Sequence, residues 1–315
     1  MSVTRKTRAR LKPMVIVAGI VVGLGFLALV AVCLISGRGL GLWRFAHLGR
    51  ALFDSRSVSS YSHGDFTNVI FLHHSTGHRL IEQGGVRERF TEAGYDFWDH
   101  DYTWPGLRRP DGSPAGYSYS IPDDNTDPDG LARVFAQRAY KLPLNAFSGL
   151  LQHEVIVFKS CFPVSDITSD EQLEGYQSYY RDMRDVMDGH RDRVFIVVTP
   201  PPLNPAETNP EAAARARAFA SWLKSDEYLN GHPNVFTFDF FDYLAEDDPT
   251  SPDYNMLRQA YRQGSDSHPN QAANEVIGPF FVDSIVDAVQ RYRVIRELVG
   301  APNTAITQKT FGKEL

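Results

Sequence analysis

Four short runs of apolar residues limit most strongly what this chain can fold into. They are continuous rather than alternating: 68–72 (NVIFL), 155–158 (VIVF), 194–198 (VFIVV) and 235–238 (VFTF), with 95–98 (YDFW) as a shorter fifth run. A strand that is apolar on both faces is typical of a parallel sheet that helices cover on both sides. We therefore expect these runs to form the centre of an α/β domain.

Helical patterns separate the runs. Apolar side chains recur at three- and four-residue spacing from Leu173 to Met187. Asn209-Pro210-Glu211 combines a capping residue, a first-turn proline and a first-turn acid, which together predict a helix start. A last helix is expected at 272–299. This alternation of strand and helix predicts a three-layer α/β/α sandwich around a parallel sheet.

A different apolar run, residues 14–36, contains no charged residue. As a helix it would be roughly 34 Å long, which is enough to cross the hydrocarbon core of a membrane. It is longer than the apolar part of a cleaved signal peptide, the main alternative. Five Lys and Arg residues precede it, so the positive-inside rule puts the N-terminus in the cytoplasm. We expect an uncleaved single-pass anchor in the cell membrane, with the following domain extracytoplasmic.

This interpretation divides the chain into a basic cytoplasmic leader at 1–13, a transmembrane signal anchor at 14–36, a juxtamembrane linker at 37–65, a globular domain at 66–300 and a tail at 301–315. The charge divides similarly, because residues 1–54 hold eight of the 32 Lys and Arg residues but one of the 38 acids. The remaining acidic body argues against a nucleic acid partner, since phosphate binding needs a basic face. Cys33 and Cys161 fall in different segments, so no disulfide is expected within the domain.

Polar motifs follow the predicted strands, and in parallel sheets chemistry gathers outside the carboxyl ends of the strands. In chain order they are His73-His74-Ser75-Thr76-Gly77, Lys159-Ser160-Cys161, residues 199–204 (TPPPLN) and, before the last helix, Asp266-Ser267-His268-Pro269-Asn270. Taken alone, Ser75 could cap a helix or act as a nucleophile. His268 could likewise be a structural histidine or the general base that takes a proton from Ser75.

These motifs, in this order, resemble those of the SGNH/GDSL hydrolase family. The resemblance covers roughly residues 66–290 and rests on the serine after the first strand, the TPPPLNP segment and the late His-Pro-Asn. It implies a flavodoxin-like sheet of five parallel strands in the order 2-1-3-4-5. It also implies that the protein cleaves esters through a Ser–His–Asp triad without a metal or other cofactor, with Ser75 as nucleophile and His268 as base.

The chain departs from the family in two motifs. Where the family has an aspartate three residues before the histidine, this chain has Ser265, so Asp266 is our candidate for the triad acid. A dyad, or an acid from elsewhere in the chain, stays open. The oxyanion hole also departs: the family uses a glycine after the second strand and an asparagine in a Gly-x-Asn-Asp motif after the third, and the candidates here are the Ser75 amide, Gly106 and the Ser160 side chain. Losing one such donor costs about 2.7–4 kcal/mol of transition-state stabilisation.

Four further residues flank these motifs and are expected to line the site: His74, Gly77, Cys161 and Asn204. Cys161 is also an alternative nucleophile, although a small cysteine with apolar neighbours is more often simply buried.

Two clusters suggest metal ligands. Residues 123–130 (DDNTDPDG) resemble the start of a calcium loop, but the twelfth position, which needs a glutamate, is Ala136. Pro128 instead favours a turn that begins a helix. His73, His74, His78, His100 and Asp101 could supply zinc ligands, but adjacent histidines on a strand point to opposite faces. We expect no metal at the site and keep a metal-dependent hydrolase as a third hypothesis.

The sequence thus predicts a membrane-anchored serine esterase or deacylase that acts on a small acyl ester. The candidate substrate is an O-acetyl group on a surface glycan, which Tyr102, Trp104, Tyr117 and Tyr119 could bind unless they pack a loop. The alternative is a catalytically inactive domain of the same fold that binds a glycan or an assembly partner.

Overall fold

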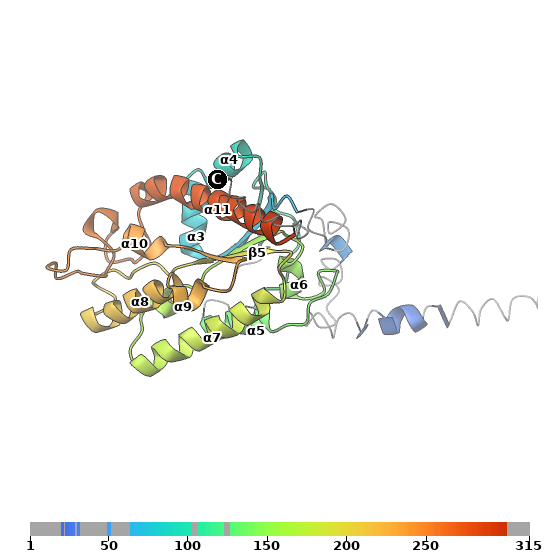
Figure 1. Cartoon of the computed structure of the whole chain (residues 1–315), viewed down its shortest axis with the longest axis horizontal. Helices are drawn as coiled ribbons and strands as arrows, with labels where there is room; N and C mark the ends of the chain where they lie inside the picture. Colours follow the sequence, from blue (N-terminus) through green and yellow to red (C-terminus); the bar gives the residue numbers. More distant parts are fainter. Residues whose placement is uncertain are drawn as a thin grey trace, which may run out of the picture.

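A mixed sheet of six strands forms the centre of the protein (Figure 1). The computed structural model describes residues 20–21, 23–28, 30–31, 49–51, 64–101, 106–122 and 127–300. The strands are β1 (Asn68–His73), β2 (Asp96–Asp101), β3 (Leu107–Arg108), β4 (Val155–Phe158), β5 (Val194–Val198) and β6 (Val235–Phe238). All five apolar runs of the sequence are strands, which confirms that part of the prediction.

The predicted count and order of the strands were wrong. The sheet has the order β3-β2-β1-β4-β5-β6, because β3 adds a sixth strand outside β2. This strand runs antiparallel, with Asp99 opposite Arg108 and His100 opposite Leu107. Two residues are too few for a recognisable pattern, and for that reason the sequence did not reveal it. The other five strands pair in parallel in the order β2-β1-β4-β5-β6.

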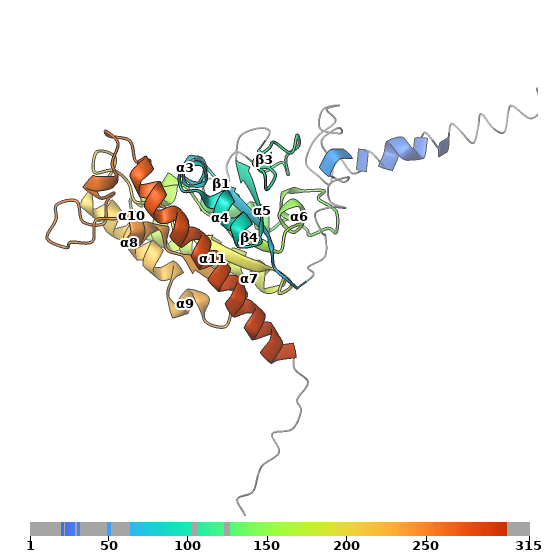
Figure 2. The ribbon, with the colours of Figure 1, turned by 90° about the horizontal axis from the view of Figure 1, so that it is seen from above.

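Helices cover both faces of the sheet, so the structure has three layers (Figures 1 and 2). One face carries α3 (Ser75–Gln83), α4 (Val86–Glu92), α10 (Phe240–Leu244) and α11 (Gln271–Gly300). The other carries α5 (Pro128–Phe135), α6 (Ala146–Leu150), α7 (Asp170–Asp188), α8 (Pro210–Leu223) and α9 (Asp226–Leu229). The three helices predicted from the sequence are confirmed as α7, α8 and α11.

The strand β4 explains why the apolar runs are continuous. Val155 and Val157 pack into the core beneath α3 and α11, whereas Ile156 and Phe158 pack into the core beneath α5 and α7. Successive strand residues point to opposite faces, so a strand between two helical layers needs an apolar side chain at every position.

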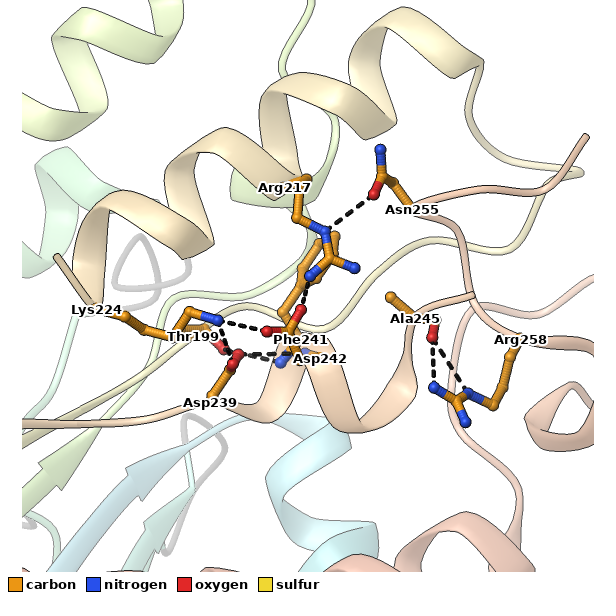
Figure 3. Close-up of polar contacts among 9 residues, drawn as sticks. All are labelled: Thr199, Arg217, Lys224, Asp239, Phe241, Asp242, Ala245, Asn255 and Arg258. Atoms are coloured by element: carbon orange, nitrogen blue, oxygen red, sulfur yellow. Dashed lines mark hydrogen bonds and ion pairs between the residues drawn. The ribbon is translucent and has the colours of Figure 1, made fainter. Parts of the chain in front are cut away.

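The carboxyl ends of β5 and β6 are held by a polar network that reaches α8 (Figure 3). Thr199, which follows β5, accepts a hydrogen bond from the Phe241 backbone N–H at 2.8 Å and donates to Asp239 at 3.3 Å. Lys224, at the end of α8, pairs with Asp239 and Asp242. Surface ion pairs of this kind contribute little free energy singly. Together they fix where the chain leaves β5.

Two glycines set the distance between α3 and α11. A Cβ atom on Gly278 would lie 2.1 Å from the Gly84 carbonyl oxygen and 2.6 Å from its Cα atom. The backbones therefore touch where α11 crosses the end of α3. Beside this contact, the Asn274 side chain donates to Gln83 at 2.6 Å. The helix that begins at Ser75 is thus held directly against the helix that follows His268.

The predicted membrane anchor lies largely outside the described residues, as do the leader, most of the linker and the tail at 301–315. Within the described part of the chain, no helix has the length and apolar character needed to cross a membrane.

Replacing Gly278 with alanine should push α11 away from α3. We expect the free energy of unfolding to fall by about 1–3 kcal/mol, the usual cost of overpacking, in thermal or denaturant melting. Gly175 on α7 is the matched control, because nothing lies within 4 Å of the Cβ position there. Gly175→Ala should leave stability unchanged or raise it slightly, since alanine favours a helix over glycine. Equal stability of the two variants would contradict the proposed contact.

Candidate active site

Ser75 lies in a sharp turn from strand to helix. β1 ends at His73 and α3 begins at Ser75, so His74 alone connects them, in an extended conformation with φ −120° and ψ −164°. The side chain of His74 does not cap the helix. The first amides of α3 and the positive end of its dipole are therefore directed at the space beside the Ser75 hydroxyl, where they would stabilise negative charge.

His268 reaches Ser75 from the other end of the chain. Its ring Nε2 lies 2.6 Å from the Ser75 hydroxyl oxygen, and its Nδ1 lies 2.6 Å from a carboxylate oxygen of Asp266. The carboxylate can only accept, so Nδ1 carries the proton and Nε2 is left to accept the Ser75 hydroxyl proton. The structure thus brings the three predicted residues into one chain of hydrogen bonds.

The two-residue spacing between Asp266 and His268 is sufficient because the loop turns on itself. The same Asp266 oxygen that binds the ring also accepts the His268 backbone N–H at 3.1 Å, a turn that aspartate side chains commonly form. Partial burial raises the pKa of Asp266, but its hydrogen bonds from His268 outweigh burial and the pKa falls below its ordinary value. The carboxylate therefore stays ionised where it must orient the ring.

Sequence analysis missed two residues that touch the His268–Asp266 pair. Arg79, one helical turn after Ser75, lies 3.6 Å from the second carboxylate oxygen of Asp266. Phe162 packs edge-on against the His268 ring, with centroids 5.2 Å apart. The four-residue spacing of Arg79 from Ser75 on α3 was a usable signal. Nothing in the sequence relates Phe162 to His268.

Asn204 does not simply line the site, because it holds the loop that carries Asp266 and His268. Its side-chain amide donates to the carbonyl oxygens of Gly264 at 3.1 Å and Asp266 at 3.2 Å. Its backbone N–H donates to the Ser267 hydroxyl at 2.9 Å, which in turn donates to the Glu207 carboxylate. The segment after β5 and the loop before α11 are thereby tied together.

The two other candidates for the oxyanion hole, Gly106 and Ser160, have different surroundings. Gly106 has φ +69°, and a Cβ there would lie 2.6 Å from the His100 ring, so both backbone and packing require glycine. Its part in an oxyanion hole stays a prediction. The Ser160 hydroxyl is turned toward α7, where it pairs with Tyr180 at 2.6 Å. The structure does not bring the Ser160 side chain to Ser75, because successive residues after β4 alternate between the faces of the sheet.

The other predicted lining residues lie close to the motif but are largely buried. His74 is 1% exposed. Gly77 lets α3 approach β1, since a Cβ atom there would lie 2.4 Å from the His73 Cβ. Cys161 is a buried free thiol at the start of the short helix η2 (Phe162–Ser165), beside the phenylalanine that packs on His268.

Two of the histidines considered as zinc ligands, His73 and His100, bind protein groups. The ring of His73 lies 3.0 Å from Asp99, and that of His100 lies 3.1 Å from the Ser118 hydroxyl. In the described part of the chain, no three His, Cys, Asp or Glu side chains lie close enough together to hold a metal ion. Of the calcium-like segment, 123–126 lie outside the described residues, and Pro128 and Asp129 form the first turn of α5.

The aromatic residues proposed as a glycan surface are packed inside the protein where they are described. Tyr117 and Tyr119 are each 1% exposed and belong to the core beneath α5 and α6. Tyr102 and Trp104 lie outside the described residues. Loop packing therefore accounts for Tyr117 and Tyr119.

Comparison with known proteins finds similarity in structures alone. No model of a protein family matches the chain, and no curated protein matches it. A protein from Bacteroides fragilis described as a candidate acylhydrolase matches with TM-score 0.47 and 12% identity over 78% of this chain and 98% of its own. A GDSL-like lipase from Bacteroides thetaiotaomicron matches with TM-score 0.45 and 10% identity over 78% and 99%. A protein described as a candidate platelet activating factor from Streptococcus pneumonia matches with TM-score 0.40 and 11% identity over 80% and 94%.

Removing the Asn204 side chain should loosen the loop that carries His268. We expect Asn204→Ala to slow the reaction of Ser75 with a fluorophosphonate by about 10- to 100-fold, because small displacements of a base have effects of this size. Asn230→Ala is the control, since Asn230 is exposed and its side chain has no hydrogen-bond partner among the described residues. Equal rates in the two variants would show that Asn204 does not position His268.

Proposed function

We propose that the protein is a serine hydrolase that cleaves ester bonds. The observation that carries this proposal is the hydrogen-bond chain from Asp266 through His268 to Ser75, at the carboxyl edge of a parallel sheet and the N-terminus of a helix. A nucleophile, a base and a group that orients the base, each within hydrogen-bond reach of the next, are the elements of acyl transfer. Ser75 and His268 are both partly exposed, so a substrate can reach them.

In the proposed reaction, the Ser75 hydroxyl oxygen attacks the ester carbonyl carbon while His268 Nε2 takes the hydroxyl proton. The resulting oxyanion accepts hydrogen bonds from the Ser75 backbone N–H and, in our proposal, from the Gly106 N–H. The C–O bond to the alcohol then breaks, and the alcohol leaves with the proton from His268. Water, activated by the same histidine, releases the acid and restores the Ser75 hydroxyl. Asp266 keeps the ring in the required tautomer throughout.

The substrate we propose is a small acyl ester, with an O-acetyl group on a surface glycan as the first candidate. The choice of a glycan as substrate rests on the predicted location of the domain alone, because Tyr117 and Tyr119 are buried and do not offer a surface for a sugar.

The decisive test is reaction with a fluorophosphonate probe. The wild-type chain should be labelled at Ser75 and should hydrolyse p-nitrophenyl acetate, whereas Ser75→Ala should lose both, because the nucleophile is absent. Ser221→Ala is the control, since Ser221 is exposed on α8 far along the chain from the triad. Labelling by the probe and hydrolysis of p-nitrophenyl acetate should both persist in the presence of EDTA.

Each other outcome favours a different hypothesis. Undiminished labelling of Ser75→Ala would rule out Ser75 as nucleophile. A wild-type protein that melts cooperatively but is never labelled would favour the non-catalytic binding domain. Activity that EDTA removes and zinc restores would favour the metal-dependent hydrolase.

We propose further that residues 14–36 anchor the protein in the cell membrane with the catalytic domain outside the cytoplasm. The support is the charge-free length of this segment and the basic residues before it. The full chain should stay in membranes washed with alkaline carbonate, and external protease should digest its domain in intact cells. Release by carbonate, or protection from external protease, would contradict the anchor or its orientation respectively.

A further inference from the structure

His73 occupies a buried position directly beneath the Ser75 turn. It is the last residue of β1 and has no exposed surface. Its ring lies against Phe71, with centroids 5.2 Å apart, and against His78 of α3 at 6.3 Å. The backbone of Gly77 rests on its Cβ atom. The triad does not use this histidine, yet the first turns of the catalytic helix are built on it.

One ring nitrogen of His73 helps to hold the peptide group that joins His74 to Ser75, together with the His78 backbone N–H, which donates to the same carbonyl oxygen at 2.9 Å. Nδ1 donates to the His74 carbonyl oxygen at 2.9 Å. In a trans peptide, the N–H points opposite to the C=O of the same group. Fixing the His74 carbonyl therefore fixes the direction of the Ser75 N–H, which is the first donor of the proposed oxyanion hole.

The other ring nitrogen is held by a buried ion pair. Nε2 lies 3.0 Å from Asp99, which is 1% exposed and pairs with Arg87 of α4. Arg87 also donates to the Arg109 carbonyl oxygen at 2.9 Å, so it is fixed in turn. The ring thus cannot rotate without breaking a contact on each side.

The groups that face the two ring nitrogens of His73 determine where the protons between His73 and Asp99 lie. Burial lowers the pKa of His73 to about 4, and the His74 carbonyl opposes that shift. Both ring nitrogens face acceptors, Nδ1 the His74 carbonyl oxygen and Nε2 the Asp99 carboxylate, so each contact needs a proton between its two atoms. The ring and the carboxyl group of this buried pair therefore hold two protons between them.

We propose that His73 is a positioning residue that aims the Ser75 amide at the oxyanion formed in the reaction. This inference rests on the proposed hydrolytic function and adds a residue outside the triad. Asp99 and Arg87 would act through His73 by holding its ring. The expected consequence is a loss of transition-state stabilisation, with little effect on substrate binding, when the Nδ1 donor is removed.

Two substitutions separate the two ring nitrogens. The Nδ2 group of asparagine can take the place of Nδ1, so His73→Asn should keep the donor to the His74 carbonyl. Glutamine places its amide near Nε2, so His73→Gln should keep the Asp99 contact and lose that donor. With p-nitrophenyl acetate, we expect kcat of His73→Gln to fall about 100-fold with KM little changed, the size of effect seen when one oxyanion donor is lost. His73→Asn should stay within about fivefold of wild type.

A second substrate distinguishes a misdirected amide from general damage to the site. Sulfur accepts hydrogen bonds poorly, so p-nitrophenyl thionoacetate should gain little from the oxyanion hole. If His73 aims the Ser75 amide, His73→Gln should lower the ratio of ester to thionoester turnover below that of wild type. A ratio equal to that of wild type, in a variant that melts at the wild-type temperature, would overturn the inference.

Different experimental results would contradict the positioning role of His73 and the proposed hydrolytic function. Absence of turnover and labelling in the wild-type chain would defeat the proposed function itself. An active wild type with an inactive Ser75→Ala, together with an unchanged ratio in His73→Gln, would defeat the role of His73 alone. If His73→Gln does not fold, nitrogen-15 NMR of the wild-type histidines decides, because a His73 Nδ1 without a proton would overturn the inference.

Discussion

The close backbone contact between Gly84 and Gly278 is the constraint on which the site depends. Ser75 and His268 are 193 residues apart in the chain; Ser75 begins one of the two helices that meet at these glycines, and His268 precedes the other. A hydrogen bond of 2.6 Å between the two side chains tolerates little displacement of either helix. Side chains at the crossing would hold the helices further apart. The absence of a Cβ atom on both helices therefore matters for the chemistry as much as for the packing.

The structure contains two aspartate–histidine pairs, Asp266–His268 and Asp99–His73, whose surroundings differ. Asp266 and His268 are partly exposed, with side-chain exposures of 45% and 20%, so their hydrogen bond adds little to stability and the pair remains accessible. Asp99 and His73 are fully enclosed, and leaving either without a partner would carry the cost of a buried polar group. In the proposed reaction the first pair exchanges a proton with the reactant, and in our inference the second keeps a backbone amide in one direction.

The loop that carries Asp266 and His268 has no helix or strand of its own, so contacts with neighbouring segments fix its position. Asn204 binds two carbonyl groups of this loop, and Ser267 binds back to the segment of Asn204. That segment leaves β5 at Thr199, whose hydroxyl is bound within the network that links β6, α10 and α8. The carboxyl edge of the sheet therefore determines the position of a histidine that belongs to none of its strands.

The strands and the main helices were predictable because each has a local cause. Continuous apolar runs need two covered faces, as β4 and β5 have, and Asn209 caps α8 through its own side chain. β3 was not predictable, since two residues carry no period. The resemblance to a known family suggested Ser75 and His268. The sequence left the identity of the acid open, because Asp266 lies two residues before His268 and the family's aspartate lies three residues before its histidine.

Position in three dimensions decided the remaining questions. The turn of the 266–268 loop lets Asp266 reach the His268 ring, and the alternation of side chains after β4 directs Ser160 toward Tyr180 instead of toward Ser75. The sequence by itself determined which residue types stand at the strand ends, since hydrophobic periodicity is a local property. Only the tertiary structure decided which of them meet, because hydrogen bonds and burial depend on distances between segments that are far apart in the chain.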